Sequence, residues 1–290
     1  MKLVDLFSQG KFVITSEVAP PKGTDLTEMI ESAEGLRSRV DAVNITDQQS
    51  SVMRLGSLVA SQQLKDRGIE PVFQLTCRDR NRIALQSDLL SACAAGIENV
   101  LCLTGDHVCL GDTPGAKPVF DLDSVSLLAA AQKLNGGVDI EGNELAGSAN
   151  LCLGAVVTPD ADTVETQLIK MGRKVEAGAT FFQTQAIFDA ETFATFMEQA
   201  KAFGVPVMAG IILLKSAGMA NFMNANIAGV HVPQPLIDEM AATPKGERRA
   251  KGVDIAARIV RDVKDVCQGI HIMALGWEKE VPAILDGAGL

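Results

Sequence analysis

The chain has 290 residues, of which 47% are hydrophobic and 21% are charged, and its formal net charge is −10. This composition is typical of a globular protein and excludes a disordered chain, which has too few apolar residues to bury a core. The acidic charge argues against a general nucleic-acid binder, because neutralising phosphates requires clustered Lys and Arg. The densest basic run, residues 245–251, is interrupted by Glu247.

The first eleven residues carry charges and lack a long apolar run. We therefore expect neither a secretory signal nor a membrane span, and a cytoplasmic protein. None of the six cysteines forms a CxxC pair, which argues against a disulfide framework in a chain of this size. Cys102, His107 and Cys109 lie close in sequence, but structural zinc needs four ligands, so we expect no metal site there.

Short runs of apolar and β-branched residues recur along the chain, and most are nearly continuous rather than alternating. This pattern is typical of strands that are covered on both faces, as in a parallel sheet. We expect eight strands, at residues 12–18, 41–46, 71–76, 99–104, 151–157, 180–184, 206–212 and 270–275.

Helical patterns fall between these runs, at residues 25–37, 50–66, 79–95, 121–134, 160–177 and 189–203. Thr24 is a candidate N-cap for the first, and Gly68 a candidate C-cap for the second. About 60 residues separate the last two strands and should hold several helices. The strand–helix rhythm repeats at roughly 27–30 residues, the size of a βαβ unit.

Eight such units predict an α/β fold, a (β/α)8 TIM barrel that occupies residues 1–290 as a single domain. A doubly wound open sheet is the alternative. No GxGxxG follows any strand, so a Rossmann dinucleotide site has no support.

In such barrels the active site lies at the carboxyl ends of the strands. Glu17 ends the first strand among apolar neighbours, where a carboxyl group is kept neutral more easily and can donate a proton near neutral pH. The alternative for Glu17 is an ion pair with Lys or Arg. Asp106 follows Gly105, which lets the backbone approach a ligand closely, and the alternative for Asp106 is a turn cap.

Gln183 and Gln185 alternate along the sixth strand, so both should face the same side. Their amides would suit a ligand amide or a pterin edge, although a buried structural network would satisfy them as well. Arg173 and Lys174 end the preceding helix, where they would contact a phosphate or ribityl group or complement the helix dipole. Lys215 follows the seventh strand and is the basic residue we place at the mouth.

Five segments occur in an order that matches a known family: residues 12–23 (FVITSEVAPPKG), 74–78 (QLTCR), 103–106 (LTGD), 172–179 (GRKVEAGA) and 182–189 (FQTQAIFD). Together they resemble the 5,10-methylenetetrahydrofolate reductase family over essentially the whole chain, in its bacterial form with the catalytic barrel alone. The resemblance implies a flavoprotein barrel that reduces 5,10-methylenetetrahydrofolate to 5-methyltetrahydrofolate, with hydride passing through bound flavin.

The resemblance also implies roles for individual residues. Glu17 matches the family's general acid, Asp106 the aspartate near flavin and folate, and Gln185 the glutamine that contacts folate; Gln183 is placed beside it. The expected flavin contacts are Thr46, Gln74, Thr76, Thr104, Gly105, Asp106, Arg173 and Lys174.

Some positions depart from the family pattern. Gln74 stands where the family has histidine, Thr104 stands where it has arginine, and the chain contains no tyrosine, so the flavin is FAD or FMN. Met219 or Phe222 would replace the phenylalanine that stacks on folate. Electrons would come from NAD(P)H or from a partner electron-carrying subunit, as in relatives from acetogenic bacteria, and an oligomer or hetero-complex is expected.

Two other functions remain open at this point. One is a pterin-binding barrel that transfers methyl groups without flavin. The other is a non-catalytic subunit of a larger complex that keeps the barrel alone.

Overall fold

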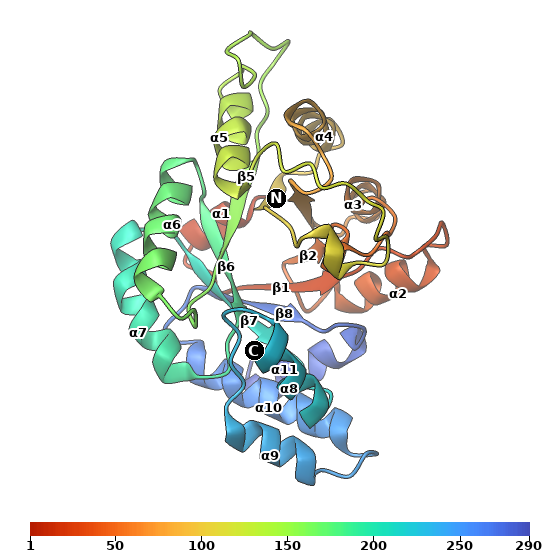
Figure 1. Cartoon of the computed structure of the whole chain (residues 1–290), viewed down its shortest axis with the longest axis vertical. Coiled ribbons are helices and arrows are strands. Elements are labelled where there is room, and N and C mark those ends of the chain that lie inside the picture. The colour runs from red at the N-terminus through yellow and green to blue at the C-terminus, as the bar shows by residue number, and fades with distance from the viewer.

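The computed structural model describes residues 1–290 and confirms the predicted barrel. Eight parallel strands close in sequence order, and β8 pairs back onto β1 (Figure 1). The strands are β1 (Val13–Val18), β2 (Ala42–Ile45), β3 (Pro71–Thr76), β4 (Asn99–Leu103), β5 (Cys152–Val157), β6 (Phe181–Ala186), β7 (Val207–Ile212) and β8 (Gly269–Met273). Each expected strand is present, with ends that differ by at most two residues.

Helices surround the barrel on its outer side (Figure 1). They are α1 (Leu3–Ser8), α2 (Thr27–Leu36), α3 (Ser57–Lys65), α4 (Arg82–Ala94), α5 (Ser124–Asn135), α6 (Val164–Glu176), α7 (Ala190–Ala200), α8 (Ala217–Asn226), α9 (Gln234–Ala242), α10 (Arg248–Val263) and α11 (Val281–Ala288). Short 3-10 turns are η1 (Gln49–Ser51), η2 (Val108–Leu110), η3 (Lys201–Phe203) and η4 (Glu278–Glu280). None of these helices combines the length and apolarity that crossing a membrane requires.

Strand alternation divides the buried side chains into two groups. Outward-facing residues such as Val43, Phe73 and Val100 pack against the helices in a cluster of 65 buried residues. Inward-facing residues of the strands, such as Val13, Val72 and Phe181, form a separate cluster of nine together with two leucines of α1. Because this inner layer fills the barrel, the interior is open to ligands only near the carboxyl ends of the strands.

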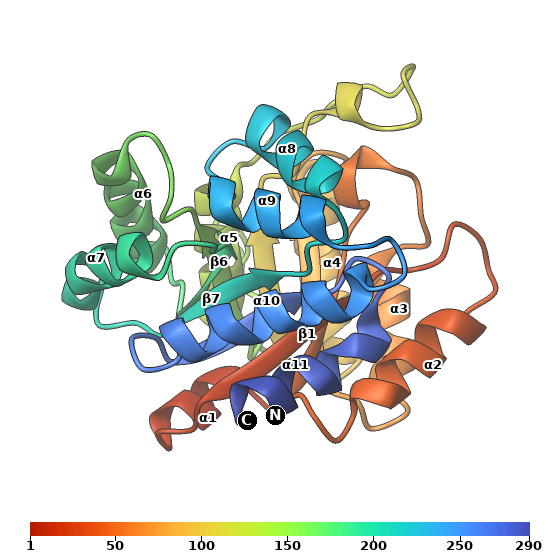
Figure 2. The same ribbon diagram turned by 90° about the horizontal axis from the view of Figure 1, so that it is seen from below.

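Helix α1 closes the amino end of the barrel. Its buried residues Leu3 and Leu6 belong to the inner cluster. Figure 2 shows α1 and both termini at one end of the molecule, and α8 with the loop after β4 at the other. The site must therefore be sought at the α8 end.

The region before α3 differs from the expected helix 50–66. Residues 52–56 are extended or bent, and Gln48, Ser50 and Ser51 have positive φ angles. This segment packs against the loop after β4, since a Cβ added to Gly111 would lie 1.8 Å from the carbonyl oxygen of Ser51. A close contact between two loops thus replaces the first turns of the predicted helix.

Of the two predicted helix caps, the one at Gly68 is confirmed and the one at Thr24 is wrong. Gly68 has a φ of +73° just beyond α3, as expected of a residue that ends a helix. Thr24 is not the cap of α2, because the side chain of Asp25 instead accepts hydrogen bonds from the backbone and the hydroxyl of Thr27.

Candidate functional site

A cavity of about 550 Å³ opens at the carboxyl ends of β1, β2 and β8. This volume lies within the usual range for small-molecule sites. The lining carries four carboxyl groups and a single basic side chain, Arg54, so it favours a ligand that presents N–H donors. The polar lining residues are Glu17, Asp25, Glu28, Ser32, Thr46, Gln49, Arg54 and Glu278.

Glu17 lies on the inner side of β1 at the wall of this cavity. Its Oε1 accepts a hydrogen bond of 3.0 Å from Nε2 of Gln74, and Nε2 of His271 lies 3.4 Å from the same oxygen. The side-chain contacts of Glu17 are polar, with Gln74 and His271, rather than the apolar surroundings expected, and the adjacent Val18 packs on the outer side of the strand. The ionisable side chain nearest to its carboxyl group is His271, and no lysine or arginine pairs with it.

Below Glu17 a polar network crosses the barrel interior. Nδ1 of His271 lies 2.9 Å from the hydroxyl of Thr15, which in turn accepts a hydrogen bond of 3.1 Å from Nε2 of Gln183. The amides of Gln183 and Asn44 form a pair of hydrogen bonds of 2.9 and 3.2 Å. All four residues are buried, so this network forms the floor of the site.

The floor position of Gln183 differs from the expected substrate contact. Its side chain is 1% exposed and its amide is already used on both sides by Thr15 and Asn44. The alternative of a buried structural network describes Gln183 better. Gln185 lies within an irregular stretch of β6, is half-buried, and has an amide that makes no hydrogen bond within the chain. Of the two glutamines, Gln185 is the one able to contact a ligand.

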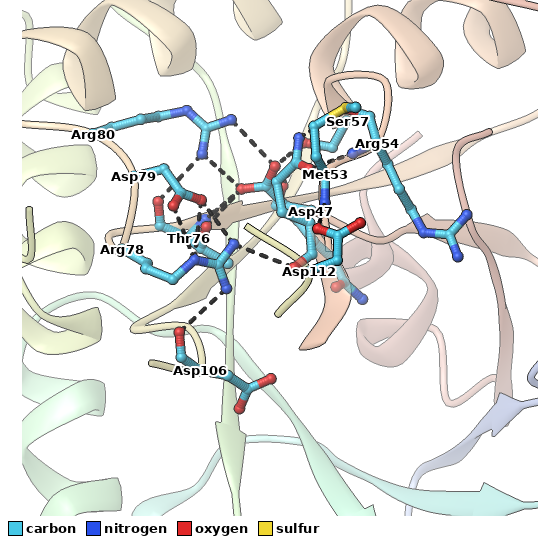
Figure 3. Close-up of polar contacts among 12 residues, drawn as sticks. Asp47, Met53, Arg54, Ser57, Thr76, Arg78, Asp79, Arg80, Asp106 and Asp112 are labelled. Carbon is cyan, nitrogen blue, oxygen red and sulfur yellow. Dashed lines mark hydrogen bonds and ion pairs between the residues drawn. The ribbon is translucent and has the colours of Figure 1, made fainter. Parts of the chain in front are cut away.

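A second buried cluster supports the wall between β2 and β3 (Figure 3). The carboxylate of Asp47 accepts hydrogen bonds from Nη1 of Arg80 at 2.7 Å and from both the backbone and the hydroxyl of Thr76, at 2.9 and 2.8 Å. Arg80 also pairs with Asp88 at 2.9 Å, and these two carboxylates raise its pKa against the opposing effect of burial. The cluster fixes the positions of the two strand ends.

Arg78 joins the loops that follow β2 and β4. Its guanidinium is 2% exposed and donates to the carbonyl oxygens of Gln48 and Asp106, at 3.2 and 3.3 Å (Figure 3). The side chain of Asp106 is exposed and accepts no hydrogen bond, so the turn-cap alternative is not supported by the structure. The Asp106 carboxylate is free to meet a ligand.

Thr46 carries a buried hydroxyl group that has no hydrogen-bond partner in the protein. Its side chain is 2% exposed, it lines the cavity, and its hydroxyl oxygen makes no hydrogen bond. Buried polar atoms are normally paired, so this hydroxyl is suited to a polar atom of a ligand.

Three other expected flavin contacts are already occupied. The amide of Gln74 donates to Glu17, the hydroxyl of Thr76 donates to Asp47, and the hydroxyl of Thr104 accepts from the backbone of Ser124 at the start of α5. Thr104 thus faces the helix rather than the barrel interior. These residues support others that line the site.

Arg173 and Lys174 lie in the last turn of α6. Arg173 is exposed, whereas Nζ of Lys174 donates a hydrogen bond of 2.6 Å to the carbonyl oxygen of Val156 on β5. Burial lowers the pKa of Lys174 to about 8. The structure therefore separates the two residues, and Lys174 is the one that points toward the strands.

The rim near β7 and β8 carries an aromatic residue between two cations. Nζ of Lys215 and the guanidinium of Arg249 each lie 5.0 Å from the ring centroid of Trp277. Burial lowers the pKa of Lys215, and Arg249 adds to this effect while Glu278 opposes it. On the neighbouring α8, Met219 is half-buried against the core and Phe222 is 60% exposed.

Sequence reasoning did not identify His271, Asn44 or Asp47. His271 is one of three histidines and lies inside an expected strand, and this combination of a titratable residue with an apolar strand was a usable signal. Asn44 and Asp47 end the second strand and were noted only as part of a polar run.

The fold and the site define a class: a (β/α)8 barrel with a polar small-molecule cavity at the carboxyl ends of its strands. Residues 2–289 match the family model described as methylenetetrahydrofolate reductase. The chain belongs to this family.

Curated relatives carry the same name at low identity. A 5,10-methylenetetrahydrofolate reductase from Pectobacterium carotovorum is 27% identical, and the match covers 87% of this chain and 82% of the relative. A probable methylenetetrahydrofolate reductase (NADPH) from Caenorhabditis elegans is 24% identical over 81% of this chain, but the chain spans only 34% of that relative's length.

Solved structures agree on the fold. An uncharacterized protein from Clostridium thermocellum that binds two copies of 5-methyl-5,6,7,8-tetrahydrofolic acid superposes with a TM-score of 0.67 at 17% identity, over 98% of this chain and 97% of that one. A Yersinia pestis DHPS bound to a pterine-sulfa conjugate superposes with a TM-score of 0.51 at 11% identity, over 96% and 92% of the two chains.

Proposed function

We propose that the protein reduces 5,10-methylenetetrahydrofolate to 5-methyltetrahydrofolate, with residues 1–290 as one catalytic domain and a bound flavin as hydride carrier. The observation that carries the proposal is a carboxyl group, Glu17, held by Gln74 and His271 at the wall of a cavity that also exposes an unpartnered buried hydroxyl, Thr46. Family membership supports the substrate, as does the 5-methyltetrahydrofolate bound by the Clostridium thermocellum protein.

Residues at the carboxyl ends of β2 and β4 fit a flavin. An isoalloxazine edge alternates carbonyl oxygens and N–H groups, which match the free hydroxyl of Thr46 and the free carboxylate of Asp106. Gly105 lets the loop that carries Asp106 pack against β3, since a Cβ at this position would lie 3.1 Å from Cβ of Thr76. Bound flavin would supply the hydride, and FAD and FMN both remain candidates.

The chain's own residues would handle the folate. Opening the five-membered ring of the substrate requires a proton on the departing nitrogen, which creates an iminium electrophile. Glu17, which lines the cavity, would donate that proton. Gln185 would hydrogen-bond the pterin edge, while Met219 or Phe222 on α8 would cover its face. Lys215 would meet the carboxylates of the folate tail.

The first test is the absorbance spectrum of the purified protein, reconstituted with FAD or FMN and mixed anaerobically with 5-methyltetrahydrofolate. We expect flavin bands that bleach as the folate is oxidised. Failure to bind either flavin would overturn the proposal and favour a flavin-free methyl-transfer barrel. Flavin that stays oxidised with folate bound would also contradict it and favour a non-catalytic subunit.

The electron donor is tested in the opposite half-reaction. We propose either NAD(P)H or a partner electron-carrying subunit as the source. Anaerobic addition of NADH or NADPH that bleaches the flavin would establish direct use. Flavin that bleaches with dithionite but with neither nucleotide would establish the partner.

The role of Glu17 is tested by Glu17→Gln, which removes the acid and keeps the shape. We expect folate turnover to fall by about 10²–10⁴-fold, with flavin still bound and reducible. Glu31→Gln, on the exposed face of α2, is the matched control and should retain activity. Loss of flavin in the Glu17 variant would show that the assigned role is wrong.

A further inference from the structure

The contact between Glu17 and His271 has a defined proton arrangement. Nε2 of His271 faces Oε1 of Glu17 at 3.4 Å, and Nδ1 faces the hydroxyl of Thr15 at 2.9 Å. The side chain of His271 is 4% exposed, so its hydrogen-bond partners are protein groups. A neutral histidine carries one N–H, and its partners decide which nitrogen that is.

The hydrogen bonds of the Thr15 hydroxyl determine which nitrogen of His271 carries the proton. It already accepts a hydrogen bond from Nε2 of Gln183 at 3.1 Å. Its single hydrogen has one acceptor within hydrogen-bond distance, Nδ1 of His271. Nδ1 is then the acceptor and Nε2 carries the proton.

We propose that Thr15 and Gln183 hold His271 as the Nε2–H tautomer and thereby make it a positioning residue for Glu17. Nε2 of His271 lies 3.4 Å from Oε1, and Nε2 of Gln74 donates to the same oxygen at 3.0 Å, so both donor groups gather at Oε1. The proton that Glu17 delivers is therefore carried on Oε2. This inference rests on the proposed role of Glu17 as the general acid.

The other tautomer, with the proton on Nδ1 of His271, is disfavoured by the contacts that it would make. Rotating both amides of the Gln183–Asn44 pair preserves their mutual hydrogen bonds and turns an oxygen toward Thr15. Thr15 would then donate to Gln183 and accept from Nδ1–H. The bare Nε2 would face an ionised Oε1, and two acceptors in contact inside the barrel lose the energy of a hydrogen bond. The Nε2–H tautomer avoids this conflict whether Glu17 is ionised or carries its proton on Oε2.

The tautomer can be read directly by long-range ¹H–¹⁵N correlation on protein labelled with ¹⁵N-histidine. The chain has only three histidines, and His271→Gln identifies the signals by their loss. We expect Nε2 of His271 at the shift of a protonated nitrogen and Nδ1 at that of an unprotonated one. A proton on Nδ1 in the unmodified protein, with or without one on Nε2, would overturn the proposal.

Thr15→Val removes the hydroxyl at nearly constant volume. We expect the Nδ1 signal to shift and the single-tautomer pattern to be lost, whereas Thr15→Ser keeps the pattern. The matched control is Ser16→Ala, which removes the neighbouring buried hydroxyl that donates to the carbonyl of Ile272 instead. An unchanged His271 pattern in Thr15→Val, or the same change in Ser16→Ala, would contradict the assignment.

Kinetics then separate positioning from folding. Thr15→Val should lower kcat for folate reduction on the order of ten-fold with little change in KM, because the acid is misplaced while the cavity is intact. Thr15→Ser should recover most of the loss. A change confined to KM, or no recovery with Ser, would refute the positioning role. If the unmodified protein reduces no folate, the proposed function fails, and the spectra still decide the tautomer.

Discussion

At the scale of single residues, Gly105 shows how tightly the loop after β4 is built. Its φ is +90°, and a Cβ there would lie 3.1 Å from Cβ of Thr76 and 3.2 Å from Cβ of Arg78. A larger residue would therefore meet two obstacles, an unfavourable backbone angle and side-chain crowding. The exposed carboxylate of Asp106 follows directly, so its position depends on this glycine.

We predict that Gly105→Ala lowers the free energy of unfolding by more than the roughly 1 kcal/mol that a positive φ costs alone. Gly10→Ala is the matched control, since Gly10 has a φ of +73° with nothing within 4 Å of its Cβ position. Urea denaturation of both variants measures the difference. Equal losses of unfolding free energy in the two variants would show that the loop after β4 shifts to accommodate the added methyl group.

The site residues were predictable to different degrees. Glu17 could be predicted because it ends an apolar strand with a polar group at the mouth of the barrel, whereas Thr46 was expected from the family resemblance. The side chains that contact Glu17 could not be predicted from the sequence. Glu17 and His271 lie on β1 and β8, the first and last strands, and only closure of the barrel brings them together. Gln74 was expected to touch flavin, because nothing local shows that its amide meets a carboxylate on another strand.

At the scale of elements, the strands were predicted nearly to the residue because burial on both faces gives them continuous apolar runs. Helix α1 was not expected, since six residues are too few for a clear helical period. The start of α3 was misplaced because a contact between two loops, centred on Gly111 and Ser51, leaves no local pattern. Tertiary contacts determine both the presence of α1 and the start of α3.

Helix α1 should matter for stability out of proportion to its length. Leu3 is fully buried and fills the amino end of the barrel. We predict that Leu3→Ala lowers the free energy of unfolding by about 2–5 kcal/mol. Leu110→Ala, the same change at a side chain that is 66% exposed, should have little effect. Chemical denaturation followed by circular dichroism measures both variants. Similar small losses of stability would contradict the role of Leu3 in filling the amino end of the barrel.

Helix α6 carries a lysine whose burial should be visible in the pH dependence of stability. The pKa of Lys174 falls from 10.5 to about 8, so between these values the unfolded chain binds more protons than the folded one. The unfavourable contribution of this charge, up to roughly 3 kcal/mol, is present below pH 8 and disappears toward pH 10.5.

We therefore predict that Lys174→Met gains stability relative to the unmodified chain most strongly near pH 7, and that this gain shrinks as the pH rises from 8 to 10.5. Denaturation curves of the two proteins at each pH give the difference. Lys133→Met provides the comparison at a more exposed lysine. A difference that does not vary with pH would refute the pKa assigned to Lys174.

At the scale of the whole molecule, the six cysteines divide sharply. Cys109 is exposed and Cys93 is half-buried, whereas burial raises the pKa of Cys77 to about 12 and of Cys267 to about 11, and also raises those of Cys102 and Cys152. The folded state therefore keeps these four thiols protonated above pH 9, where the unfolded chain begins to ionise.

We predict that a thiol reagent modifies Cys109 rapidly in the native protein and the buried thiols only on unfolding. Because their folded pKa values are raised, their contribution to stability is complete below pH 9 and declines above it. Mass spectrometry after brief labelling gives the count. Cys109→Ser should abolish the rapid phase, and rapid modification of any of the four buried thiols would contradict the packing described for the barrel.

The aromatic residue between Lys215 and Arg249 has a consequence for observation of the site. Trp277 is the single tryptophan of a chain without tyrosine, so the intrinsic fluorescence comes from one point on the rim beside the cavity. A ligand that draws either cation away from the indole would alter that emission without any added label. The same scarcity leaves the near-ultraviolet absorbance of the chain weak, so a bound chromophore would dominate the spectrum of the complex.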